Sequence, residues 1–183
     1  FGEDDADLDT VRAAISKPGF GILPACPLMH ATGQFTTFIA LCGAGSVTTL
    51  VDHALDVVEL LDTIERHRIE ALTIVGDAFA KPILRELDAQ PERWDISSLV
   101  LVISSGVMWS EPVKRGLLDH VPGAMLHDAF SSSEAIGMGQ SVSTAGNPAG
   151  TAKFVLGRRS RVIGDDGLDV VPGSGQIGRV AIG

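Results

Sequence analysis

The chain has 183 residues, 45% of them hydrophobic and 20% charged, so it can bury the core of one domain and is not an intrinsically disordered chain. Its formal net charge of -9 argues against a nucleic-acid partner, because phosphate binding needs clustered Lys and Arg. The short basic cluster of Arg158, Arg159 and Arg161 is expected to be a solvated face.

The first 17 residues begin with an acidic run and continue as a weakly helical segment. An acidic start has none of the features of a secretory leader, so we expect a cytoplasmic protein. The chain does not begin with Met, and we therefore expect it to be a fragment of a longer protein.

Residues 18–51 carry no formal charge apart from His30. Prolines and glycines interrupt this run, so we expect a short strand at 21–24, a buried helix near 34–42 and a strand at 46–51 rather than a membrane span. Peripheral membrane contact and homo-oligomerisation stay open. Cys26 and Cys42 lack metal-ligand spacing and are expected to be buried, reduced thiols.

Strand and helix patterns alternate from residue 56 onward. Asp56 and Glu59 have the spacing of a helix-capping box, and Pro82 is expected in the first turn of a second helix. The expected elements are a helix at 57–67, a strand at 71–75, a helix at 82–89, a strand at 99–104, a helix at 110–120 and a strand at 124–128. This alternation predicts an α/β fold with a doubly wound, mostly parallel sheet flanked by helices.

Residues 127–137 (HDAFSSSEAIG) begin at the end of the last of these strands and continue beyond it. Ligands bind at the carboxyl ends of the strands in such sheets, where this stretch and residues 104–106 both lie. The hydroxyls of the three serines suit an anionic oxygen, and the carboxylate of Glu134 suits Mg2+. The alternative is a polar loop with no ligand.

After residue 146 glycines, prolines and short β-type runs alternate. We therefore divide the chain into an α/β part at 1–146 and a segment at 147–183 that begins a small antiparallel β subdomain. Residues 173–178 (GSGQIG) match GxGxxG, but β-type sequence follows them, which indicates a turn between strands rather than a dinucleotide site.

Two further patterns carry little chemistry. Ser131–Ser133 with Asp128 and either His127 or His120 could suggest a serine hydrolase, but there is no GxSxG elbow. His30, in an uncharged loop, is by itself typical of a buried structural histidine.

Four segments, in this order, resemble motifs of the adenylate-forming superfamily, which includes acyl-CoA synthetases, peptide-synthetase adenylation domains and luciferases. Residues 27–33 (PLMHATG) resemble P-L-x-H-x-x-G, and residues 103–110 (ISSGVMWS) resemble I-S-G-G-A-P-L-S. Residues 128–134 (DAFSSSE) resemble N-x-Y-G-x-T-E, and residues 178–183 (GRVAIG) resemble G-E-L-x-x-x-G. The sequence around Trp109 is most similar to that of actinobacterial-type fatty acyl-CoA ligases.

The resemblance implies roles for individual residues. Phe130 would stack on adenine, Asp128 would contact its amino group, and the backbone at Ser105 and Gly106 would run past the adenine and the acyl chain. His30 would stand at the mouth of the acyl pocket.

For the phosphates, the resemblance implies that Ser133 contacts the α-phosphate and that Glu134 holds Mg2+, so these two residues are the expected catalytic pair. Ser131 departs from the motif, since the family has glycine there, and Ser105 likewise replaces a glycine. The family's phosphate loop would precede residue 1, and its hinge and small C-terminal domain would follow residue 183. The chain is thus expected to be the centre of the large N-terminal domain.

The reaction implied is activation of an apolar, fatty-type carboxylic acid by ATP to acyl-AMP, followed by transfer to CoA, with Mg2+ as cofactor. Small molecules, namely the acid, ATP and CoA, would be the partners, and the fragment alone would be inactive. The alternatives are a non-catalytic nucleotide- or acyl-binding module and a peptide-synthetase-type adenylation domain.

Overall fold

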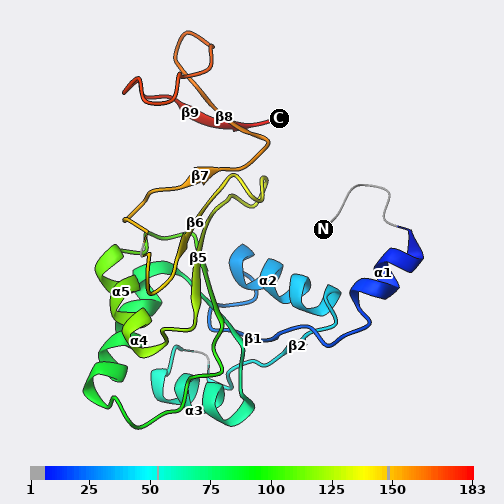
Figure 1. Ribbon diagram of the computed structural model, residues 1–183, viewed down its shortest axis with the longest axis vertical. Coiled ribbons are helices and arrows are strands. Elements are labelled where there is room, and N and C mark those ends of the chain that lie inside the picture. Colours follow the sequence, from blue (N-terminus) through cyan, green and yellow to red (C-terminus); the bar gives the residue numbers. More distant parts are fainter. Residues whose placement is uncertain (1–6, 53, 148) are drawn as a thin grey trace.

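The computed structural model describes residues 7–52, 54–147 and 149–183 (Figure 1). Its helices are α1 (Leu8–Ala14), α2 (Ala31–Cys42), α3 (Val57–His67), α4 (Gly76–Ala89) and α5 (Glu111–His120). The strands are β1 (Gly21–Pro24), β2 (Ser46–Val47), β3 (Ala71–Ile74), β4 (Leu101–Ser105), β5 (Met125–Phe130), β6 (Gly139–Ser143), β7 (Val155–Leu156), β8 (Ser160–Ile163) and β9 (Arg179–Ile182).

The main sheet has the strand order β2-β1-β3-β4-β5-β6-β7. Strands β1 to β5 pair in parallel. Strand β6 pairs antiparallel with β5, and β7 pairs antiparallel with β6. The order reverses direction at β1, so right-handed crossovers place α2 on one face of the sheet and α3, α4 and α5 on the other. Figure 1 shows α2 across the sheet from α4 and α5. The predicted doubly wound, mostly parallel α/β fold is confirmed.

The hydrophobic core lies between the sheet and the face that carries α3, α4 and α5. Leu60 and Ile64 of α3, Leu87 of α4, Leu117 of α5 and Leu126 of β5 are buried together. Each helix places apolar residues at helical spacing on the face toward the sheet, as the sequence pattern predicts.

The start of α3 confirms half of the predicted capping box. Asp56 caps the helix by accepting hydrogen bonds from the backbone N–H groups of Val58 and Glu59. The Glu59 carboxylate instead accepts hydrogen bonds from the backbone of Val51 and Asp52, so it ties the preceding loop to the helix.

Two predictions for residues 31–42 are wrong. Helix α2 begins at Ala31, and among its hydrophobic side chains Phe38, Ile39 and Leu41 are exposed. Its buried positions are the small residues Thr32, Gly33 and Thr36 of its first turns, and the helix packs on β1, β2 and β3. Cys42, at the end of α2, is exposed, whereas Cys26 is buried.

The prediction that Pro82 lies in the first turn of its helix is also wrong. Helix α4 begins at Gly76, and Pro82 lies inside it. The earlier start has a tertiary cause, since the backbone N–H of Asp77 donates to the carbonyl of Met108 at 3.0 Å.

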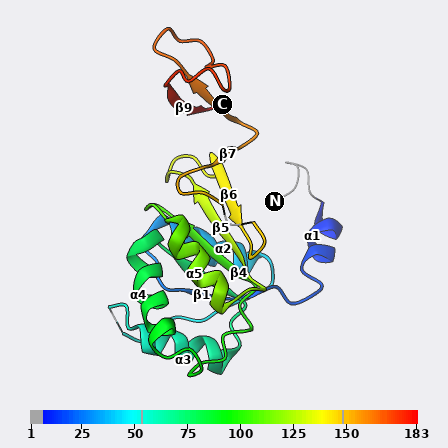
Figure 2. The ribbon, with the colours of Figure 1, turned by 60° about the vertical axis from the view of Figure 1, so that its left-hand side comes forward.

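The C-terminal part contains the predicted antiparallel hairpin, in which β8 pairs with β9 (Figure 2). Gly173 and Gly175 have φ angles of +82° and +77° in the connection between these strands, so GxGxxG is a turn, as predicted. Strand β7 pairs with β6 in the main sheet. In the described part of the chain no helix is long and apolar enough to cross a membrane.

Candidate functional site

The carboxyl ends of β4 and β5 lie side by side, as the sequence pattern predicts. The two strands pair in parallel, with Ser105 opposite Ala129. The segment after β4 and the serine-rich segment after β5 therefore leave the sheet at the same edge, where doubly wound sheets bind ligands.

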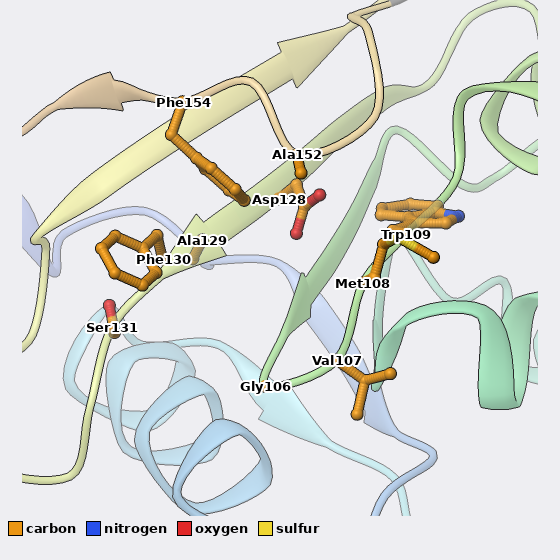
Figure 3. A pocket seen from close by; sticks show the side chains of 10 residues that line it. All are labelled: Gly106, Val107, Met108, Trp109, Asp128, Ala129, Phe130, Ser131, Ala152 and Phe154. Atoms are coloured by element: carbon orange, nitrogen blue, oxygen red, sulfur yellow. The ribbon is translucent and has the colours of Figure 1, made fainter. Parts of the chain in front are cut away.

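A hollow of about 230 Å³ opens between these two segments (Figure 3). It lies over Gly106, Met108 and Trp109 from the first segment and over Asp128 and Phe130 from β5, and Phe154 closes one side. Of the predicted site residues, Gly106, Asp128 and Phe130 line this hollow, whereas Ser105, His30, Ser133 and Glu134 do not.

Asp128, at the floor of the hollow, forms a buried ion pair with Lys114 of α5. The Nζ atom of Lys114 lies 3.0 Å from Oδ2 of Asp128, and the two side chains are 1% and 5% exposed. The ammonium also lies 5.5 Å from the ring centroid of Trp109, which is itself fully buried. Burial raises the pKa of the Asp128 carboxyl, and the hydrogen bond and charge of Lys114 oppose that rise.

Two aromatic rings form the rim of the hollow. The centroids of Phe130 and Phe154 are 5.6 Å apart, and the rings are tilted by 40°. Phe130 remains partly exposed, so a planar group has access to it. Phe154 belongs to a segment that is anchored to α5, because the backbone N–H of Glu111 donates to the hydroxyl of Thr151 at 2.8 Å.

The start of α4 holds the segment after β4 in place. The hydroxyl of Ser104 accepts a hydrogen bond from the backbone N–H of Gly76, and Oδ1 of Asp77 accepts hydrogen bonds from the N–H and hydroxyl of Ser110. Burial would raise the pKa of Asp77, but the hydrogen bonds from Ser110 and the charge of Lys81 lower it below its usual value. These contacts keep Asp77 ionised as the acceptor that fixes Ser110.

His30 lies beside the same edge of the sheet. Its Nδ1 accepts a hydrogen bond from the N–H of Thr32 at 3.2 Å and so caps α2. The ring lies against Gly106, where a Cβ atom would be only 3.2 Å from Cε1 of His30. Gly106 also has a φ of +93°, which favours glycine. His30 is exposed, so its interpretation as a buried structural histidine is wrong.

Ser133 and Glu134 lie in an exposed turn after β5. The backbones of Ser132 and Ala135 pair with each other across this turn, and the hydroxyl of Ser131 accepts a hydrogen bond from the N–H of Gly137. Within the described ranges, no group of three or more His, Cys, Asp and Glu residues could hold a metal ion. A cation at Glu134 would therefore take its other ligands from bound phosphate or water.

Sequence reasoning missed Lys114, Trp109 and Phe154 as site residues. Lys114 had a usable signal, because Leu117 and Leu118 follow it at helical spacing and mark the buried face of α5. Phe154 had none, since only the tertiary path of its segment brings it beside Phe130.

Comparison with known proteins identifies the family to which the chain is similar. A family profile described as "AMP-binding enzyme" matches residues 8–183. The medium/long-chain-fatty-acid and 3-oxocholest-4-en-26-oate CoA ligase of Mycobacterium tuberculosis is 34% identical over 99% of this chain. The medium-chain acyl-CoA ligase Mig of Mycobacterium avium is 32% identical over 93% of it. The chain spans 32% and 31% of the lengths of these two relatives.

A solved structure shows the same fold. The crystal structure of the anthranilate CoA ligase AuaEII in complex with anthranoyl-AMP matches 88% of this chain with a TM-score of 0.69 at 18% identity. The match covers 31% of that protein.

Proposed function

The chain belongs to the AMP-binding enzyme family, and from that premise we propose that it is the central segment of the large domain of an AMP-forming acyl-CoA ligase. In the first step a carboxylate attacks the α-phosphate of ATP and releases pyrophosphate. In the second step the thiol of CoA attacks the acyl-AMP and releases AMP.

The observation that supports this proposal best is the convergence of three motif segments at one edge of the sheet. Residues 27–33, 103–110 and 128–134 are far apart in sequence, yet the ring of His30 lies against Gly106 and Ser105 pairs with Ala129. An AMP-forming ligase needs its nucleotide and its acid held together for in-line attack, and a shared edge allows that.

The hollow itself suits a nucleobase better than a phosphate. Its lining has mostly aromatic and apolar side chains, with the carboxylate of Asp128, the hydroxyl of Ser131 and no cation. We propose that the adenine ring stacks on Phe130, that its amino group donates to Asp128, and that the backbone at Ser105 and Gly106 runs along the base.

The phosphates would then lie over the exposed turn. We propose that the hydroxyl of Ser133 donates to the α-phosphate and that Glu134 helps to hold Mg2+. The donor set fits this ion, because Mg2+ is commonly bound by one or two carboxylates together with substrate phosphates and water. When bound, the ion would neutralise phosphate charge in the first step.

The acid would reach the site past His30. We propose an apolar acid of the fatty or steroid side-chain type, in keeping with the names of the mycobacterial relatives. We also propose that the protein is cytoplasmic, which agrees with its proposed use of ATP and CoA. We further propose that residues 1–146 form the α/β part of the domain and that residues 147–183 begin its β subdomain.

The test is an assay of the full-length protein that contains this segment. With Mg2+, ATP and fatty acids of graded length, we expect release of pyrophosphate that depends on the acid, and acyl-CoA once CoA is added. A carrier protein in place of CoA should give no acyl product; acyl transfer to the carrier would identify a peptide-synthetase-type domain instead. Nucleotide binding without pyrophosphate release with any acid would identify a non-catalytic binding module.

A further inference from the structure

Lys114 is the most unusual charged side chain among the described residues. It is fully buried in the middle of α5, and its ammonium contacts the Asp128 carboxylate and faces the Trp109 ring. Removing two charges from water costs free energy that their mutual attraction does not always recover. A buried pair is therefore weak evidence for stability, and its position directly beneath the hollow suggests a role in binding.

The surroundings of Asp128 leave Lys114 as its one close cationic partner in the described structure. The neighbouring strands β4 and β6 contain no ionisable residue. The other groups that act on the carboxyl are His127, next to it on β5, and Asp77 at the start of α4, whose negative charge disfavours ionisation. Burial acts in the same direction as Asp77, so loss of Lys114 would move the pKa of Asp128 further upward.

We propose that Lys114 is a positioning residue that holds Asp128 as an ionised, acceptor-only group and thereby selects a purine with an exocyclic amino group over one with an exocyclic carbonyl. This inference rests on the proposed function, in which Asp128 faces the base.

The selectivity follows from hydrogen-bond chemistry. Lys114 engages Oδ2 of Asp128, which leaves Oδ1 as an acceptor for the hollow. The amino group of adenine donates to such an oxygen, whereas the carbonyl of hypoxanthine is an acceptor and is repelled by it. A protonated carboxyl or an amide can donate, so either would tolerate the carbonyl.

The experiment measures kcat/KM of the full-length protein for ATP and for inosine triphosphate, with one fatty acid, across a range of pH. For Lys114→Met we expect the preference for ATP over inosine triphosphate to fall about tenfold or more, which is the value of one lost hydrogen bond to a charged group. We expect the loss mainly as a higher KM for ATP. As the pH is lowered, kcat/KM for ATP should begin to fall at a higher pH than in the unmodified protein, because Asp128 protonates more easily without Lys114.

A second variant guards against misfolding. Lys114→Met combined with Asp128→Asn leaves no buried unpaired charge, and the amide can donate or accept, so we expect the same loss of preference without the shift in the pH profile. Arg115→Met, on the same helix, removes an exposed ion pair with Glu111 and serves as the control that should change neither quantity.

The outcomes separate this inference from the proposed function. If the unmodified protein releases no pyrophosphate with any acid, the proposed function fails and takes the inference with it. If it is active but both Lys114 variants keep the original preference for ATP, or lose activity equally with both nucleotides, the function stands and the inference is overturned.

Discussion

Asp128 and Glu134 are carboxylates six positions apart, and their environments give them different chemistry. Asp128 is buried and paired with Lys114, whereas Glu134 is exposed and has no hydrogen bond or ion pair with any described residue. A buried carboxylate with one free oxygen suits recognition of a single donor. An exposed carboxylate keeps its full hydration shell available for exchange with a hydrated cation.

This difference leads to a prediction for Glu134. Glu134→Gln in the full-length protein removes the negative charge that we propose helps to hold Mg2+, and it keeps the size of the side chain. We expect acid-dependent release of pyrophosphate to fall about 100-fold, as when one charge-stabilising group is lost, and the Mg2+ concentration for half-maximal rate to rise. Glu92→Gln changes an exposed acid in the loop after α4 and should leave both values as they were. Unchanged activity in Glu134→Gln would remove Glu134 from the site.

For individual residues, the sequence predicts the positions of side chains that match a motif. It misses side chains that reach the site only through tertiary packing. Gly106, Asp128 and Phe130 were placed correctly at the edge of the sheet by resemblance and by strand order. The helical pattern indicates that Lys114 lies on the buried face of α5, but only the tertiary structure shows that its partner is Asp128. Taken alone, the uncharged surroundings of His30 indicated burial, but the residue is exposed at the start of α2, which it caps.

At the scale of elements, the start of α4 matters most for the site. Gly76 has a φ of +49°, and a Cβ atom there would collide with the carbonyl oxygens of Val107 and Met108. Its close approach to that loop is a tertiary feature, so the sequence pattern around Pro82 did not reveal it. Where helices are held by their own amphipathic pattern, as in α3, the predicted bounds agree with the structure.

The close approach at Gly76 predicts a large effect of a small substitution. Gly76→Ala should lower the free energy of unfolding by about 2–4 kcal/mol, from backbone strain and steric conflict, and should raise the KM for ATP because Met108 and Trp109 move with the loop. Gly123→Ala is the matched control, since a Cβ atom there meets nothing within 4 Å. Denaturant unfolding and steady-state kinetics measure the two effects. Equal stability of the two variants would show that the loop yields without cost.

At the scale of the whole molecule, the alternation of strands and helices was sufficient to predict the sheet. It was not sufficient to predict which helix surfaces are buried. The near-continuous apolar runs in β3 and β4 indicate a sheet between two layers, and the structure confirms this. The apolar composition of α2 suggested burial as well, but Phe38, Ile39 and Leu41 face outward. The sequence shows which residues are hydrophobic, but it does not show which segment of the protein packs against them.

We predict that the chain by itself is inactive, because it has little positive charge near the proposed phosphate position. The turn at residues 131–137, over which we place the phosphates, contains no Lys or Arg, and the chain carries a formal net charge of -9, so little in it offsets the charge of a triphosphate. We expect residues 1–183 alone to release no pyrophosphate above background with Mg2+, ATP and a fatty acid, while the full-length protein does so under the same conditions. Circular dichroism of the isolated chain establishes that it is folded when assayed. Acyl-AMP formation by residues 1–183 at the full-length rate would show that these residues contain all the phosphate contacts the reaction needs.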